Sequence, residues 1–337
     1  MPLVAALNGC FFNAPYYQGE PSDHFDGKHF FNSTPNTRPR NGDLIRWRLT
    51  RDPGFWPDYR DVPAGPKPVE RTADGDLIVT FINHTTVLIQ MDGINILTDP
   101  IYSQRCSPLS WAGPMRRRPP GIAFDDLPPI DYVLISHNHY DHLDVPTLKR
   151  LRDAHQPVFI TGLGNAALLQ SEGIDSVVEI DWRESTSIKN DLTIIGTPAL
   201  HHSIRGVSDK NRSLWLGIVI KSRNGNVFFS GDSGYYDGFK TIGDDYGPFR
   251  LALLPIGAYK PRWFMQAFHS SPDEAVKIAD DIRSRLSVPI HYGTFPLGDD
   301  GESDPLFDLL NALRKEPDAP EFLILSHGHG FRVPRLD

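Results

Sequence analysis

Residues 134–144 read Leu134-Ile135-Ser136-His137-Asn138-His139-Tyr140-Asp141-His142-Leu143-Asp144, so an apolar run leads directly into three histidines and an aspartate. A buried strand followed by a tight loop can aim several side chains into one concave site. His137 and His139 could bind one metal ion, and Asp141 and His142 a second ion beside it. Imidazole and carboxylate ligands suit zinc, and a catalytic zinc keeps one position open for water. We therefore predict a catalytic metal site here rather than a solvated polar loop.

Four ligands are too few for two zinc ions, so further ligands must come from other parts of the chain. Three candidates come soon after other apolar runs, namely His201, Asp232 and His291. Glycines next to Asp232 and close to His291 allow the sharp turns that loops around an ion need. For each of these residues taken alone, a polar side chain that caps a turn is the competing interpretation.

This order of motifs resembles the metallo-β-lactamase superfamily: HxHxDH, a later histidine, an aspartate in a Gly-Asp-Ser-Gly setting and a last histidine. The closer resemblance is to N-acyl-phosphatidylethanolamine phospholipase D (NAPE-PLD) and its bacterial relatives. Several stretches carry it, at residues 96–100, 127–131, 137–144, 254–259, 261–265 and 291–295. The resemblance implies an α/β fold of four layers, the αββα sandwich.

The resemblance also implies a centre with two Zn²⁺ ions. The residues that match the family's ligands are His137, His139 and His201 for one zinc, Asp141, His142 and His291 for the other, and Asp232 as a bridge between them. The chain departs from the family pattern at Asn83-His84-Thr85, where Gly-His-Ala/Ser is usual, and at His202, where an aromatic residue is common. These departures bear on the shape of the site's lip and on acyl-chain preference, not on the metals. His84 and His327 are expected to support the site by hydrogen bonding.

The implied activity is hydrolysis of a phosphodiester or phospholipid of the phospholipase D type. A hydroxide shared by two zinc ions would attack phosphorus in line, because zinc lowers the pKa of bound water to near 7. We expect catalytic roles for Asp141, for His269, which matches a histidine of the family, and for Tyr140, which lies between ligands. Asp99 is expected to accept a hydrogen bond from a ligand histidine. For His269, Tyr140 and Asp99, the competing interpretations are a helix start, simple packing and a turn.

Two other functions stay open at this point. A lactone or ester hydrolase of the same fold would use the same metals, with the hydroxide attacking a carbonyl carbon. A protein of another class, a non-enzymatic zinc-binding protein associated with resistance, would bind zinc without turnover. Nucleic acid is not an expected partner, because the chain carries a net charge of −8 and phosphate contacts need clustered Lys and Arg.

The first 75 residues differ from the rest of the chain in composition and in the pattern of apolar residues. Residues 1–75 are rich in Pro, Gly, Asn and Asp with scattered aromatics, which predicts an N-terminal arm packed on the catalytic domain of residues 76–337. Short apolar runs predict strands at 77–82, 86–91, 94–97, 132–136, 158–160, 177–180, 192–197, 216–221, 226–230, 251–255 and 322–326. Helices are expected at 146–154, 164–172, 272–286 and 305–314. Two sheets with helices outside follow from this order, a four-layer α/β arrangement.

No run of about 18 apolar residues occurs, so no bilayer span is predicted. Peripheral membrane contact is a hypothesis, in which an acyl-chain groove is lined by Trp111, Trp263, Phe264 and Met265; core burial is the alternative. Residues 116–118 are three arginines, which we interpret as a solvated loop rather than a site for anionic headgroups. A homodimer is left open.

The cellular compartment also stays open. Leu7-Asn8-Gly9-Cys10 loosely resembles a bacterial lipoprotein box, but the apolar run before it is too short for a signal peptide and has no basic flank. Either the box is accidental, which leaves a cytoplasmic or peripheral membrane protein, or an export signal has been trimmed from a periplasmic lipoprotein.

Overall fold

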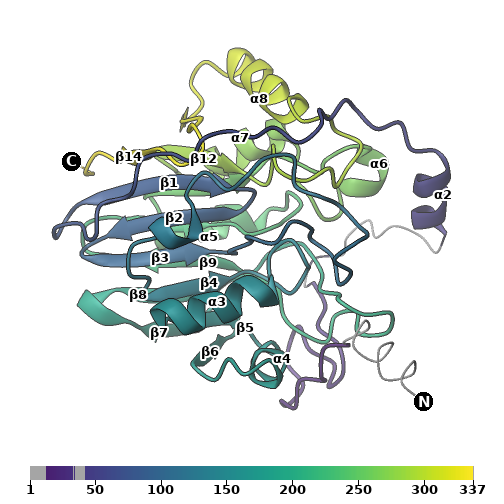
Figure 1. Cartoon of the computed structure of the whole chain (residues 1–337), viewed down its shortest axis with the longest axis horizontal. Coiled ribbons are helices and arrows are strands. Elements are labelled where there is room, and N and C mark those ends of the chain that lie inside the picture. The colour runs from purple at the N-terminus through teal and green to yellow at the C-terminus, as the bar shows by residue number, and fades with distance from the viewer. Residues whose placement is uncertain (1–12, 33, 35–41, 337) are drawn as a thin grey trace.

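The computed structural model describes residues 13–32, 34 and 42–336, which fold into two seven-stranded sheets packed face to face (Figure 1). The possible lipoprotein box lies outside the described residues. The first sheet has the order β14 (Gly330–Arg332), β1 (Leu77–Asn83), β2 (Thr86–Met91), β3 (Ile94–Thr98), β4 (Tyr132–Ile135), β5 (Val158–Gly162), β6 (Val177–Ile180). The second has the order β13 (Glu321–Phe322), β12 (Leu286–Ile290), β11 (Phe249–Pro255), β10 (Asn226–Phe229), β9 (Gly217–Lys221), β8 (Thr193–Thr197), β7 (Ser185–Ser187).

The strand that leads into the HxHxDH motif is buried on both faces. Successive side chains of a strand point to opposite sides of the sheet. In β4, Tyr132 and Leu134 belong to the main apolar core, which includes the space between the sheets, whereas Val133 and Ile135 pack in a second core under the helices. Burial on both faces explains why this run is apolar at every position, and it fixes the start of the motif loop.

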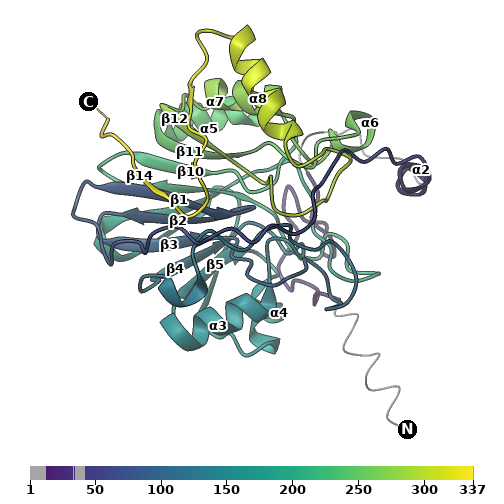
Figure 2. The same ribbon diagram turned by 45° about the horizontal axis from the view of Figure 1, so that its top comes forward.

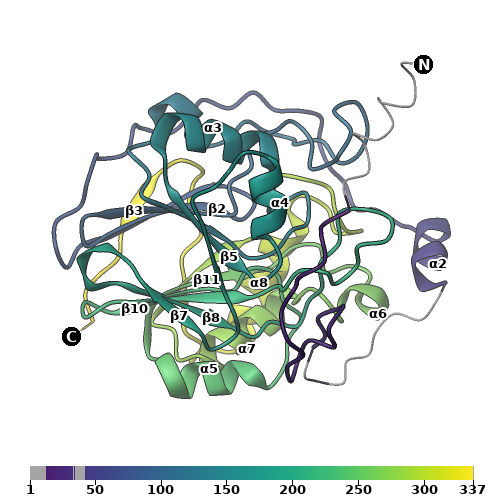
Figure 3. The same ribbon diagram turned by 90° about the horizontal axis from the view of Figure 1, so that it is seen from below.

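Helices cover the outer face of each sheet and complete the four layers (Figures 2 and 3). On the first sheet lie α3 (Val145–His155) and α4 (Ala166–Ser171); on the second lie α5 (Gly238–Tyr246), α7 (Pro272–Asp281) and α8 (Asp304–Lys315). The predicted four-layer α/β sandwich is confirmed. Among the described residues, no helix has the length and apolar character needed to cross a bilayer.

One predicted helix is too long. The helix expected over residues 272–286 ends at Asp281, and its last predicted residue, Leu286, begins strand β12. The cause is Arg283, whose backbone is left-handed with φ 56°, a conformation that stops a helix.

Several short elements were not predicted. Helix α5 contains Gly238 and Gly243, and glycine disfavours helices in an isolated sequence. Helices α2 (Asp43–Leu49) and α6 (Arg262–Met265) are also absent from the prediction, as are strands β7 and β14, because elements of three to seven residues carry little periodicity. Of the last predicted strand, 322–326, only Phe322 lies in a strand, as the second residue of β13.

The described part of the first 75 residues lies against the sandwich at several places. Phe25 and Phe30 are buried in the main core, and Asn32 donates from Nδ2 to the carbonyl oxygen of His201 at 2.9 Å. Phe55, in contrast, is largely exposed. The separation into an arm and a catalytic domain stays a prediction, but this segment shares the core of the sandwich.

Candidate metal centre

The candidate ligands gather at one edge of the sandwich, where strands that run in the same direction end. Within each sheet these strands are parallel to one another, directly or through an antiparallel neighbour. The residues that follow them are His84 after β1, Asp99 after β3, His137 after β4, His201 after β8, Asp232 after β10 and His291 after β12. Both sheets therefore contribute side chains to one site.

Three histidines form the first group. His137 Nε2 lies 2.8 Å from His139 Nδ1, and His201 Nε2 lies 3.3 Å from that same Nδ1. Two of the remaining ring nitrogens have hydrogen-bond partners: His201 Nδ1 donates to the carbonyl oxygen of Phe268 at 2.8 Å, and His137 Nδ1 lies 2.9 Å from Ser136 Oγ. Three lone pairs can thus point at one position, and the binding of a metal ion there stays a prediction.

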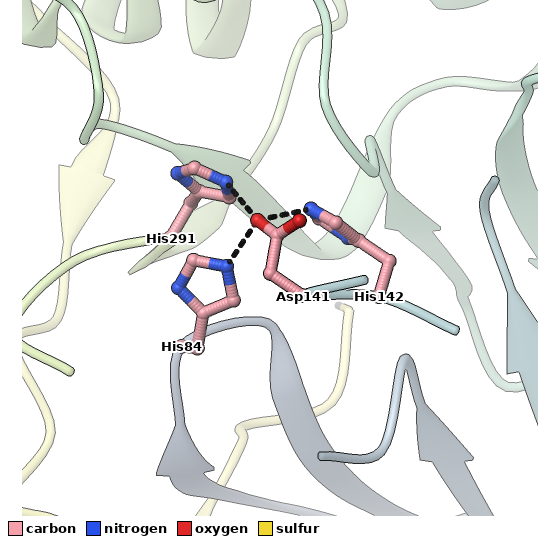
Figure 4. Close-up of side chains that lie close together, drawn as sticks. All are labelled: His84, Asp141, His142 and His291. Carbon is pink, nitrogen blue, oxygen red and sulfur yellow. Dashed lines mark hydrogen bonds and ion pairs between the residues drawn. The ribbon is translucent and has the colours of Figure 1, made fainter. Parts of the chain in front are cut away.

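The second group is built around the carboxylate of Asp141 (Figure 4). Its Oδ2 lies 3.2 Å from His142 Nε2, 3.4 Å from His291 Nε2 and 3.0 Å from His84 Nε2. These four residues, drawn in Figure 4, form one of the clusters whose geometry could hold a metal ion. The predicted ligands Asp141, His142 and His291 are therefore brought together, with His84 added.

Asp232 lies between the two groups. Its Oδ2 is 3.0 Å from His291 Nε2 and 3.2 Å from His142 Nε2, and 3.9 Å from His201 Nε2 of the first group. Asp232 is thus close to candidate ligands of both groups, and its role as a bridge between two metal ions stays a prediction. His269 also reaches it, with Nδ1 at 3.6 Å from the same oxygen.

Backbone geometry at the site is unusual. His84, Asp99 and His291 all have left-handed backbone, with φ of 47°, 33° and 62°. Such conformations cost about 1–3 kcal/mol each in non-glycine residues and persist only where the surroundings enforce them. Here the His291 amide donates to the His84 carbonyl at 2.8 Å, which ties the two sheets together. Gly231 is required too, because a Cβ there would lie 2.5 Å from Ser136 Cβ.

Electrostatics divide the histidines into two kinds. Burial lowers the pKa of His137 well below its ordinary value, that of His139 to about 3 and that of His201 to about 4, so these rings are neutral at pH 7. Burial acts in the same direction on His142 and His291, but the carboxylates of Asp232 and Asp141 outweigh it. They raise the pKa of His142 well above its ordinary value and that of His291 to about 9.

The site has the features that a bound cation would explain. Asp232 Oδ1 is buried and has no hydrogen-bond partner among the described residues, and Nε2 of His142 and of His291 has only ion-pair contacts with the carboxylates. Buried polar atoms are costly when unpaired, so these groups call for a partner. The donor set of imidazole nitrogens and carboxylate oxygens suits zinc and related divalent metals. The residues therefore fit a metal centre.

A surrounding layer of hydrogen bonds orients these groups. His142 Nδ1 donates to Asp99 Oδ2 at 2.6 Å, and the same carboxylate accepts from the amide and hydroxyl of Ser136. The hydrogen bond expected between Asp99 and a candidate ligand is thus confirmed. This arrangement fixes the tautomer of the ring and leaves His142 Nε2 directed into the site.

Comparisons with known proteins agree with this geometry. Residues 94–292, more than half of the chain, match the beta-lactamase superfamily domain. The chain belongs to the beta-lactamase superfamily. It is 42% identical over 236 residues to N-acyl-phosphatidylethanolamine-hydrolyzing phospholipase D 1 of Caenorhabditis elegans. The aligned region covers 67% of this chain and 66% of that relative. It is 38% identical over 278 residues to a protein of Mycobacterium tuberculosis, covering 81% of this chain and 74% of the relative.

Among solved structures, the metallo hydrolase Igni18 of Ignicoccus hospitalis superposes with a TM-score of 0.58 at 20% identity, covering 76% of this chain and 98% of that one. This likeness shows the fold. The beta-lactamase superfamily membership and the His/Asp clusters together make the chain a metal-dependent hydrolase.

The two further residues predicted to be catalytic differ in position within this beta-lactamase superfamily site. His269 joins the cluster, whereas the ring of Tyr140 lies under Arg205, whose guanidinium carbon is 3.9 Å from the ring centroid. Tyr140 also lines a cavity of about 450 Å³ with Asp144 and Lys149. Catalytic roles for both residues stay predictions.

The arginine run was misread. Arg116 is fully buried and donates from Nε to the carbonyl of Ser103 and from Nη2 to that of Ile101, so its role is structural and not that of a solvated loop. Arg118 pairs with Glu302 and contacts His327, whose ring also lies 4.7 Å from that of Phe81. The four residues proposed to line an acyl-chain groove differ in their exposure to solvent. Phe264 and Met265 are buried, whereas Trp111 and Trp263 are exposed.

One residue that the sequence did not single out holds the HxHxDH loop in place. Arg205 donates from Nη1 to the carbonyl oxygens of Asn138 and Leu143, both at 2.8 Å, and so fastens the two ends of the motif loop. The sequence could not indicate this role of Arg205, because no local pattern marks a contact between residues more than 60 positions apart.

Proposed function

We propose that this chain is a two-zinc phosphodiesterase of the phospholipase D type, acting on N-acyl-phosphatidylethanolamine or a similar phosphodiester. The observation that carries the proposal is the pair of adjacent ligand groups that share Asp232. A binuclear arrangement suits in-line displacement at phosphorus, where attacking and leaving oxygens both need stabilisation. The 42% identical relative from Caenorhabditis elegans is named for the hydrolysis of N-acyl-phosphatidylethanolamine, which supports the same substrate class for this chain.

The ligands that we propose for the two zinc ions are those that the family resemblance implies: His137, His139 and His201 on one side, Asp141, His142 and His291 on the other, and Asp232 between them. When bound, the zinc ions would supply a water molecule with a pKa near 7 and a positive field for the phosphate. Asp99 keeps His142 in the tautomer that presents Nε2, and His84 holds Asp141 Oδ2 at 3.0 Å.

For His269 we propose a role in binding phosphate and in proton transfer. Its Nδ1 is buried without a partner and faces Asp232, and burial lowers its pKa well below the ordinary value. A neutral imidazole in this position can donate a hydrogen bond to a phosphate oxygen. It can also accept a proton from the attacking water and pass that proton on to the leaving alkoxide. The side chains of His269 and Asp141 are 15% and 14% exposed, whereas those of His142, His201 and His291 are fully buried, so substrate approaches from the His269–Asp141 side.

The test is metal analysis combined with a substrate panel on one preparation. We expect about two zinc equivalents per chain, as a binuclear site requires, with hydrolysis of bis(p-nitrophenyl) phosphate and of N-acyl-phosphatidylethanolamine in mixed micelles. Asp141→Asn and His142→Ala should each abolish turnover and lower the zinc content. The matched control is His155→Gln, a histidine on helix α3 outside the cluster, which should retain both.

Two results would contradict the proposal. Full turnover in Asp141→Asn would show that the site is misassigned. Hydrolysis of lactones without hydrolysis of either phosphodiester would leave the metal centre intact but assign it to carbonyl chemistry.

A further inference from the structure

Helix α2 presents its apolar side chains to solvent, which is the reverse of the usual arrangement in a globular protein. Leu44, Ile45 and Leu49 are 49%, 64% and 81% exposed, and no residue of the helix is buried. Neighbours three and four positions apart share one side of a helix, so these side chains and Arg48 lie close together on it. Phe55, just after the helix, is 81% exposed.

The helix is nevertheless held firmly. The ring of Trp47 stacks on Phe264 of α6, with centroids 5.1 Å apart, and its Nε1 donates to Asp299 at 3.0 Å. Arg51 adds a bond to the same carboxylate at 2.8 Å and one to the carbonyl of Gly298 at 2.7 Å. Anchored by this inner side, α2 stands at the edge of the molecule with its outer side turned away from the sandwich (Figures 1 and 3).

Charge in this segment is opposite to that of the whole chain. Residues 38–51 contain five arginines and one aspartate, whereas the chain carries a net charge of −8. Of the arginines that the structure describes, Arg46 lies over the ring of Trp263, which is itself 40% exposed, and Arg48 is exposed among the leucines. Large aliphatic and tryptophan side chains interleaved with arginine are the composition of helices that lie in a membrane interface.

We propose that the outer side of α2, with Phe55 and Trp263, docks on the surface of an anionic phospholipid bilayer. The apolar side chains enter the boundary between headgroups and acyl chains, and the arginines contact lipid phosphates. The position of the surface is relevant to the candidate centre, because α6, which carries Trp263 and supports Trp47, leads within four residues to His269. The surface itself does not depend on the metal centre.

The experiment is co-sedimentation of the full chain with vesicles of phosphatidylcholine alone and of phosphatidylcholine mixed with phosphatidylglycerol. We expect binding to the mixed vesicles that weakens with salt. The triple variant Leu44→Ser, Ile45→Ser, Leu49→Ser should lower the partition coefficient on the order of a hundredfold. Arg48→Gln should lower it about fivefold on the anionic vesicles. Phe307→Ser, which removes an equally exposed apolar side chain from α8, is the matched control and should bind as the unmodified chain does.

A second measurement guards against misfolded variants. Brominated lipids should quench tryptophan fluorescence less in Trp263→Phe than in the unmodified chain, since Trp263 lies at the docking surface. Vesicle binding that is unchanged in the triple variant, no binding by the unmodified chain, or a change from dimer to monomer in the triple variant without an effect on vesicles would overturn the proposal. Asp141→Asn separates it from the proposed function: that variant should lose turnover and keep vesicle binding.

Discussion

At the scale of single residues, the site depends on histidines whose two nitrogens have different partners. His142 gives one nitrogen to Asp99 and leaves the other in the cluster, and His201 does the same with the carbonyl of Phe268. Each ring is thereby fixed in tautomer and direction before a ligand arrives. This arrangement requires an unfavourable left-handed backbone conformation at His84, Asp99 and His291.

The first prediction at this scale concerns pH. The carboxylates raise the pKa of His291 to about 9 and also raise that of His142, so at neutral pH these rings carry protons that a metal ion must displace. Zinc affinity should therefore rise with pH, about tenfold per pH unit for each proton displaced, up to about pH 9. Chelator competition between about pH 6 and pH 9 measures this slope. A flat profile would show that the second group is already deprotonated.

At the scale of elements, the segment of residues 13–32 is fastened by a histidine with carboxylates on both sides. His24 Nε2 lies 2.7 Å from Asp181 and Nδ1 2.5 Å from Asp23, and its ring stacks on Trp182 at 4.4 Å. Carboxylates only accept hydrogen bonds, so both contacts require the protonated imidazolium. Burial opposes this charge, but the hydrogen bonds to Asp181 and Asp23 prevail and raise the pKa of His24.

A second prediction follows from this contact. Because the folded pKa of His24 is raised, its stabilisation is fully present below the unfolded value and is lost as pH rises through the folded value. Hydrogen exchange in residues 13–32 should accelerate from about pH 6 to about pH 9 beyond the intrinsic chemical rate. The excess should vanish in His24→Gln. Equal protection in the unmodified chain at both pH values would contradict this role.

A third prediction tests the crossing of α5 and α7. A Cβ on Gly243 would lie 2.3 Å from the carbonyl oxygen of Asp281 and 2.9 Å from Ile282 Cα. Gly243→Ala should therefore lower the free energy of unfolding by about 1–3 kcal/mol, although alanine favours helices. Urea denaturation measures the change, with the exposed neighbour Asp245→Ala as the control. A stabilised Gly243→Ala would show that the two helices can separate at no cost.

At the scale of the whole molecule, the candidate centre joins the two sheets. His137, His139, Asp141 and His142 come from the loop after β4 of the first sheet, and Asp232 and His291 follow β10 and β12 of the second. Ions bound between them would connect both halves of the sandwich. Metal binding and folding stability are therefore expected to be linked.

The corresponding prediction is that removal of metal destabilises the entire fold. A ligand present at about 1,000 times its Kd stabilises the folded state by about 4 kcal/mol, so chelation should lower the melting temperature and zinc should restore it. Calorimetry with and without chelator measures the shift, which should be small in His291→Ala. An unchanged melting temperature after verified loss of metal would mean that the sheets hold together without the centre.

The sequence alone determined the four-layer class and the seven predicted ligands that the structure brings together. The HxHxDH loop contains four of them within the six residues 137–142, and the other three follow strands whose apolar pattern is visible locally. The boundary of α7 and the presence of α5 could not be predicted, because a left-handed residue and tolerated glycines depend on what packs against them.

Only the tertiary structure decided which groups around the site contact one another across long stretches of the chain. His84 reaches Asp141 across 57 residues, Arg205 fastens the motif loop across more than 60, and Asn32 bonds the carbonyl of His201 across 169. It also turned Arg116 from an expected surface residue into a buried one and exposed the apolar side of α2. The physical reason is the same in each case: local patterns record which face of a strand or helix is apolar, whereas contacts between distant segments exist only once the two sheets have packed.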